Sequence, residues 1–150
     1  MAIIVQKFGG TSVKSPENRR AALSHITKAK NMGYDVVVVV SAMGRMGDPY
    51  ATDTLIHLLK TEGGGEVSPK KKDLIMACGE IISTAVMASY IESQGFKTEA
   101  MTGFQAGILT TADFGNAEII KVDPKPIKEK LREGNIVVVA GFQGQTEKGE

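Results

Sequence analysis

The sequence predicts an α/β fold, an αβα sandwich in which a mainly parallel sheet lies between two layers of helices. Segments rich in β-branched residues alternate with segments of helical periodicity along the chain. The segments 2–8, 35–41 and 135–141 are apolar on both faces, which is typical of parallel strands covered by helices on each side. Each ends in a polar or glycine-rich turn, and ligands of parallel sheets bind at the carboxyl ends of the strands. We therefore expect a functional site at this edge of the sheet.

Capping residues and glycines delimit the elements in the first half of the chain. We expect strand 2–8 to be followed by a helix that Ser15 caps and Gly33 ends. The nearly all-valine strand 35–41 follows, and we expect it at the centre of the sheet. After a loop, Thr52 is expected to cap a short helix.

The second half contains one long helix and several shorter elements. A helix starts at Ser68-Pro69 and runs to about Gly95. Its segment 74–91 is apolar on nearly every face, so we expect it to be buried. The remaining expected elements are a strand over 96–101, a turn-rich segment over 102–116, a weak strand over 118–122, a helix over 124–132 and the buried strand 135–141.

Composition excludes several classes of function. Lys and Arg total 18 and Asp and Glu total 17, so no overall charge favours nucleic acid or a membrane surface. Cys78 is the only cysteine, which excludes an intrachain disulfide and fits a reducing compartment. The N-terminus lacks a signal-peptide pattern, and we see no apolar run of membrane-spanning length. The sequence thus predicts a soluble cytoplasmic protein of one domain.

The segment KFGGTS, after the first strand, is one candidate site. Gly9 and Gly10 can turn backbone N–H groups outward, Lys7 adds an ammonium group, and Thr11 and Ser12 add hydroxyl donors. This set suits a phosphate or a carboxylate. It also suits a tight strand-to-helix turn with a solvated lysine, and the glycine spacing does not decide between the two.

Glu80, the single charged residue of segment 74–91, is another candidate. A buried carboxylate needs a cation or several hydrogen-bond donors. Glu80 is therefore either a receptor for an ammonium group, approached closely at Gly79, or a structural residue held by backbone amides or by a Lys or Arg. Ser41 places a hydroxyl group at the same edge of the sheet.

Other polar residues fit structural roles. His25 and His57 lie on helices without partners at metal-ligand spacing. We expect Cys78 to be a core residue rather than a nucleophile. Asp53 fits a helix cap, and the lysines 70–72 fit a solvated helix start.

Several segments, in chain order, resemble signatures of the aspartate kinases, a family of the amino-acid kinase superfamily with a carbamate kinase-like fold. The segments are KFGGTSV, VVVVVSAMGRMGDPYATDTL, CGEIIST, TGFQAGILTT and VVVAGFQGQTEKGE. Relatives such as glutamate 5-kinase and acetylglutamate kinase lack this set. The resemblance extends over the whole chain.

The resemblance implies that a phosphoryl group passes from ATP, with Mg²⁺, to the side-chain carboxylate of L-aspartate. The product would be 4-phospho-L-aspartate, in lysine, threonine and methionine biosynthesis. The implied phosphate-binding residues are Lys7, which would be catalytic, Gly9, Gly10, Thr11, Ser12 and Ser41. The implied substrate-binding residues are Ser41, Thr52, Glu80, Phe142, Gln143 and Gly144.

The family pattern continues past Glu150 into a GRGGSD-like segment, a nucleotide-binding half and regulatory ACT domains. We therefore expect residues 1–150 to be the N-terminal part of an amino-acid kinase domain, with little or no kinase activity alone. An unpaired sheet edge favours self-association, so we expect a homo-oligomer. The alternatives are a non-catalytic module that binds an anion or an amino acid, and a different amino-acid kinase.

Overall fold

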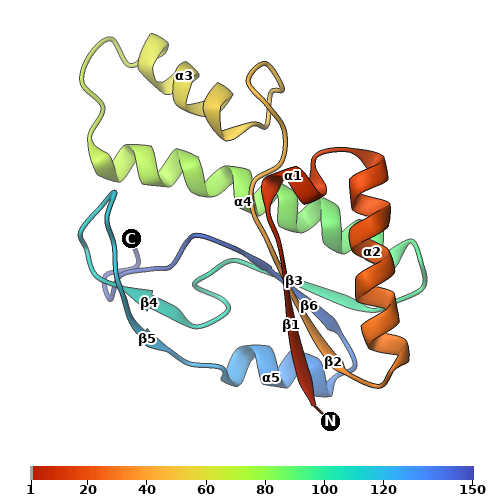
Figure 1. Cartoon of the computed structure of the whole chain (residues 1–150). Coiled ribbons are helices and arrows are strands. Elements are labelled where there is room, and N and C mark those ends of the chain that lie inside the picture. The colour runs from red at the N-terminus through yellow and green to blue at the C-terminus, as the bar shows by residue number, and fades with distance from the viewer. Residues whose placement is uncertain (1) are drawn as a thin grey trace.

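A computed structural model describes residues 2–150, in which strands and helices alternate as expected (Figure 1). The strands are β1 (Ile3–Phe8), β2 (Asp35–Val40), β3 (Thr98–Met101), β4 (Ile108–Thr110), β5 (Ile119–Val122) and β6 (Ile136–Ala140). The helices are α1 (Gly10–Val13), α2 (Pro16–Asn31), α3 (Thr52–Glu62), α4 (Pro69–Glu92) and α5 (Lys125–Arg132). Every expected element is present, and the short helix α1 and the strand β4, which lies in the expected turn-rich segment, are additions.

A parallel sheet with the strand order β1-β2-β6-β3 forms the centre of the fold. β2 and β6 are the inner strands, which confirms the central position of the valine-rich segment. β1 is an edge strand of the described sheet, and its Ile3 and Val5 side chains are 47% and 63% exposed. The expected burial of this strand on both faces is therefore wrong, because only the face of Ile4 and Phe8 packs against the core.

Helices cover both faces of the sheet, which confirms the αβα sandwich. α2 and α4 pack on one face and form the larger core cluster with β2 and β6. On the opposite face, Leu131 of α5 packs with Val137 and Val139 of β6. α3 lies outside these layers, packs against α4 and has no buried residue (Figure 1).

α4 is apolar around most of its circumference but buries one side only. Glu80 and Met87 are buried, whereas Leu74 and Ile81 are 72% and 42% exposed. The expected burial on most faces is thus wrong, and Cys78 is exposed rather than in the core. By length and composition α4 could cross a membrane, contrary to expectation, although core helices of soluble proteins pass the same test. Its packing against the sheet matches such a core helix.

Two helix starts differ in how they are capped. The Ser15 hydroxyl caps α2 as expected, because its oxygen accepts a hydrogen bond from the Asn18 N–H at 3.2 Å. At α3 the cap is Ala51 and Thr52 is the first helical residue, so the expected cap at Thr52 is wrong. The Thr52 hydroxyl makes no capping bond there and is available for another role.

Candidate active site

The loops that follow β1, β2 and β6 meet at the carboxyl edge of the sheet, as the sequence predicts. The Ser41 N–H donates to the Phe8 carbonyl at 3.1 Å, and the Gly141 N–H donates to the Val40 carbonyl at 2.9 Å. The parallel register continues these pairings and brings Gly9, Ser41 and Gly141 side by side.

The two glycines after β1 have different roles. A Cβ atom on Gly10 would lie 2.5 Å from the Ala42 carbonyl oxygen, so only glycine permits this contact between the two loops. A Cβ atom on Gly9 would meet nothing within 4 Å. Gly9 is also the N-cap of α1, and the first amides of a helix have no intrahelical acceptor. The segment is therefore both a tight turn and an open region lined by N–H groups.

The polar side chains beside these glycines are exposed. Lys7 alternates with Phe8 along β1, so it starts on the sheet face opposite α2. Lys7 forms no ion pair within residues 2–150. Thr11 and Ser12 are exposed on α1. These side chains lie next to the open region without being fixed in it.

Glu80 reaches the same edge from α4 and is 9% exposed. Its Oε1 atom accepts a hydrogen bond from the Ala42 N–H at 3.1 Å. Burial raises the pKa of the Glu80 carboxyl above its ordinary value of 4.5, and the Ala42 N–H offsets part of this effect. No Lys or Arg of the described chain pairs with it. A carboxylate with one donor retains acceptor capacity for a cationic group.

Gly79 allows two further groups to lie against the turn that carries Glu80. A Cβ atom on Gly79 would lie 2.9 Å from the Ala42 Cβ atom and 2.9 Å from the Thr52 Oγ1 atom. The Thr52 hydroxyl group therefore lies directly against Gly79, the residue next to Glu80. This arrangement allows a hydroxyl group and a carboxylate to contact one small ligand.

The loop after β6 is fixed by its glutamine. The Gln143 Nε2 atom donates to the Ala77 carbonyl of α4 at 3.2 Å, and Oε1 accepts from the Gly103 N–H at 3.4 Å. Phe142 has a φ of +58°, a left-handed conformation that is uncommon outside glycine, and its side chain is 90% exposed. Gly144 packs tightly against the side chains of β4.

Two positions that shape this edge were not singled out from the sequence, although both lie in segments that resemble family signatures. Ala42 acts through its backbone, whose N–H donates to Glu80 and whose carbonyl contacts Gly10. At Gly103 a Cβ atom would lie 2.1 Å from the Gln143 carbonyl oxygen. The turn-rich composition of segment 102–116 predicts a turn there but not this contact.

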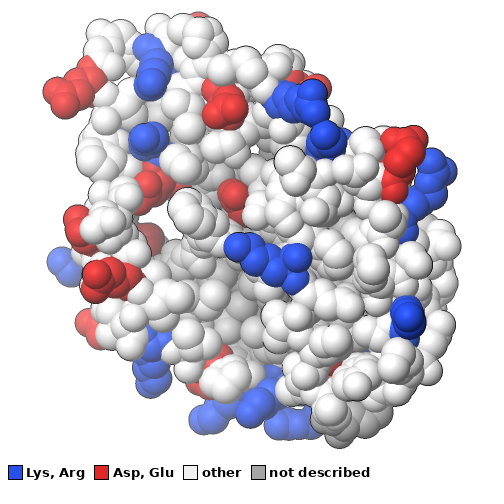
Figure 2. Space-filling model, in the orientation of Figure 1, with Lys and Arg blue, Asp and Glu red and all other residues white. Residues whose placement is uncertain are grey.

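The surrounding surface is open and mixed in charge. Figure 2 shows Lys and Arg interspersed with Asp and Glu. It also shows a hollow that, in the shared orientation of Figure 1, lies between β1 and the antiparallel pair of strands β4 and β5. A separate hollow of about 470 Å³ lies between α2 and α4, where Arg19 and Tyr90 line it. No group of three or more His, Cys, Asp or Glu in residues 2–150 could hold a metal ion. The candidate site is thus an open edge of the sheet.

Comparison with known families defines the class of protein. The model of the amino acid kinase family matches residues 2–150, and the chain belongs to that family. It is similar to "Aspartokinase 1" of Bacillus subtilis (strain 168), with 53% identity over all of this chain and 37% of the relative. It is also similar to the aspartokinase of Geobacillus stearothermophilus, with 45% identity over all of this chain and 35% of the relative. The chain spans about a third of the length of these curated relatives.

Solved structures agree with this assignment. The aspartate kinase from Synechocystis has a TM-score of 0.74 and 35% identity, over 95% of this chain and 22% of that chain. Aspartokinase III of E. coli, in complex with lysine and aspartate, has a TM-score of 0.70 over 99% of this chain and 42% of that chain. Its identity is 19%, so this second likeness supports the fold alone.

Proposed function

We propose that this chain forms the phosphate-binding and amino-acid-binding part of an aspartate kinase. The reaction transfers a phosphoryl group from ATP to the side-chain carboxylate of L-aspartate and gives 4-phospho-L-aspartate. The observation that carries the proposal is the buried Glu80, which has one amide donor at the glycine-rich edge of the sheet. The 53% identity to an aspartokinase supports the same reaction.

In this proposal Glu80 accepts hydrogen bonds from the α-ammonium group of the substrate. The hydroxyl groups of Thr52 and Ser41 donate hydrogen bonds to carboxylate oxygens of the substrate, since both residues lie at the same edge of the sheet. Phe142, Gln143 and Gly144 border the substrate from the loop after β6. An ionised carboxylate is already a nucleophile, so no general base is required.

The phosphate groups of ATP would lie at the open region beside Gly9, near the first amides of α1. Lys7, Thr11 and Ser12 would reach them from exposed positions. Phosphoryl transfer depends mainly on positioning and on neutralising charge, which the Lys7 ammonium group and oriented amides supply. Mg²⁺ would enter with the ATP phosphates, its usual ligands, and neutralise further charge.

Calorimetry with L-aspartate tests the proposal. We expect the chain to bind L-aspartate and Glu80→Gln to lose the binding, because a neutral amide does not attract an ammonium group. Glu99→Gln is a matched control, since Glu99 is a partly buried glutamate at the other end of the sheet. Failure of the wild-type chain to bind L-aspartate, or equal binding by Glu80→Gln, would contradict the proposal.

A second candidate is a non-catalytic module that binds L-aspartate without turnover. The span of about a third of the curated relatives favours it for residues 1–150 alone. We expect an ADP-release assay to show little or no turnover with this chain. Near-normal turnover would exclude the module.

We also infer a cytoplasmic location and self-association. The free edge of β1, with its exposed Ile3 and Val5 side chains, supports self-association. Analytical ultracentrifugation tests it, and a stable monomer at high concentration would contradict it.

A further inference from the structure

We propose that Gln143 is a positioning residue for Glu80. The Gln143 carboxamide holds one turn of α4 against the loop after β6, and Glu80 lies on that turn. This inference rests on the proposed function of Glu80 as the receptor for the substrate ammonium group. The family resemblance implies only that Gln143 lies beside the substrate. Its contacts show that both ends of the side chain are engaged by the protein backbone.

The contact with α4 links segments that are far apart in the sequence. The Gln143 Nε2 atom donates to the Ala77 carbonyl at 3.2 Å across a sequence separation of 66 residues. Ala77 lies inside α4, where each carbonyl already accepts the helical bond from four residues later. The glutamine therefore adds a bond that no residue of the helix itself supplies.

The other end of the carboxamide binds the segment after β3. The Oε1 atom accepts from the Gly103 N–H at 3.4 Å. The side chain must therefore offer a donor at one end and an acceptor at the other, which glutamine does and ionised glutamate or methionine does not. Gly103 is also tightly packed here, because a Cβ atom at this position would lie 2.1 Å from the Gln143 carbonyl oxygen.

The position of this α4 turn determines where the Glu80 carboxylate lies. Ala77 and Glu80 are separated by about 4.5 Å along the helix axis, which is less than one turn. Gly79 between them contacts Ala42 and Thr52, and Glu80 accepts the Ala42 N–H at 3.1 Å. A shift of this turn would therefore move the Glu80 carboxylate away from the Ala42 N–H.

Hydrogen exchange of the Ala42 amide, measured by NMR on the full chain without ligand, tests this role. Gln143→Met keeps the volume and removes both hydrogen bonds, and Gln143→Asn is too short to reach both partners. We expect either change to speed exchange of the Ala42 amide about three- to tenfold. Glu80→Ala, which removes the acceptor, sets the upper limit.

Gln105→Met is the matched control. Gln105 also accepts a loop amide, from Thr102 at 2.9 Å, but that bond spans only three residues. We expect this control to leave Ala42 exchange unchanged. A merely structural Gln143 would deprotect the Gly103 amide and leave Ala42 as in wild type. That result in both folded variants, with folding checked by circular dichroism, would overturn the proposal.

Ligand binding separates this proposal from the function on which it rests. We expect the Kd for L-aspartate to rise about three- to tenfold in Gln143→Met. If the wild-type chain binds no L-aspartate, the proposed function fails, yet the Ala42 exchange still decides whether Gln143 positions Glu80.

Discussion

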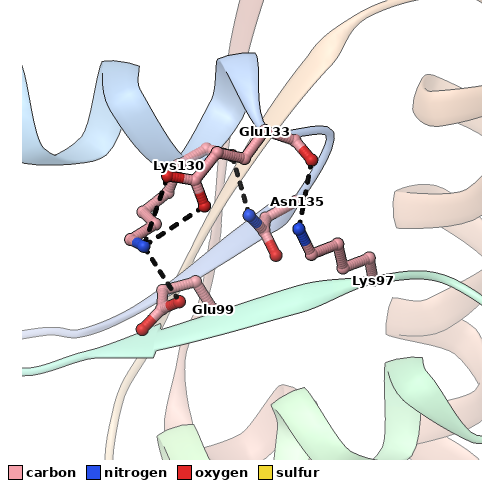
Figure 3. Close-up of polar contacts among 5 residues, drawn as sticks. All are labelled: Lys97, Glu99, Lys130, Glu133 and Asn135. Carbon is pink, nitrogen blue, oxygen red and sulfur yellow. Dashed lines mark hydrogen bonds and ion pairs between the residues drawn. The ribbon is translucent and has the colours of Figure 1, made fainter.

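The two edges of the parallel sheet are built differently. At the amino edge the polar side chains pair with one another or with backbone carbonyl groups (Figure 3), in a network of Lys97, Glu99, Lys130, Glu133 and Asn135. Lys130 lies 3.2 Å from Glu133 and 3.8 Å from Glu99. At the carboxyl edge, Glu80 has one amide donor and no ion pair among the described residues. The polar groups of the first edge are paired within the protein, and the Glu80 carboxylate at the second edge retains capacity to accept further hydrogen bonds.

The pKa of one group at each edge is raised, with opposite consequences for the charged form of that group. Hydrogen bonding to Glu133 raises the pKa of Lys130, so the folded protein favours its charged form. Burial raises the pKa of Glu80, so the folded protein disfavours its charged form. A charge that the fold disfavours and leaves without a counter-ion fits a binding role better than a structural role.

A substitution in the closely packed carboxyl edge should cause the largest loss of stability. Gly10→Ala places a methyl group 2.5 Å from the Ala42 carbonyl oxygen, and backbone cannot move aside easily. We expect the free energy of unfolding to fall by about 2–3 kcal/mol in urea titrations. Gly9→Ala is the matched control, since its methyl group enters open space, and we expect a change within about 0.5 kcal/mol. Equal losses in the two variants would show that flexibility, not contact, matters here.

Removal of a buried side-chain amide at the amino edge should cause the next largest loss of stability. Asn135 is 1% exposed, and its Nδ2 atom donates to the Lys130 carbonyl at 2.9 Å. We expect Asn135→Ala to lower the free energy of unfolding by about 1–2 kcal/mol and to leave L-aspartate binding unchanged. Asn116→Ala, at an exposed turn, should have little effect on either. Loss of L-aspartate binding in Asn135→Ala would break the division between the edges.

The sequence predicts the elements and the convergence of the three loops well, because those features follow from local patterns. The β-branched run 35–41 and the Ser15 cap need no distant partner to be recognised. Exposure is different: the uncovered faces of β1 and α4 depend on which elements lie beside them, and no local pattern records that. The amide of Ala42 and the left-handed Phe142 escape prediction too, since neither side chain signals its backbone geometry.

Replacing Glu80 should separate binding from stability. Because its folded-state pKa lies above the unfolded value near 4.5, the wild-type chain loses stability as the pH rises through the folded pKa. We expect Glu80→Gln to be about 1 kcal/mol more stable than wild type at pH 7, and to lose this advantage below about pH 4. Urea titrations at both pH values measure it. Glu99→Gln, at the amino edge, should gain no stability. A loss of stability in Glu80→Gln at pH 7 would mean that Glu80 is structural.

Removing the Lys130 charge should give the smallest effect, because its ion pairs are open to solvent. Lys130→Met keeps most of the apolar stem, and we expect a slight loss of stability at neutral pH that disappears in about 1 M salt. The raised pKa of Lys130 means that its contribution is complete below the unfolded value of 10.5 and is lost as the pH rises through the folded pKa. Thermal unfolding at low and high salt measures the difference. A loss as large as that of Asn135→Ala, and insensitive to salt, would show that ion pairs rather than the buried amide hold the amino edge together.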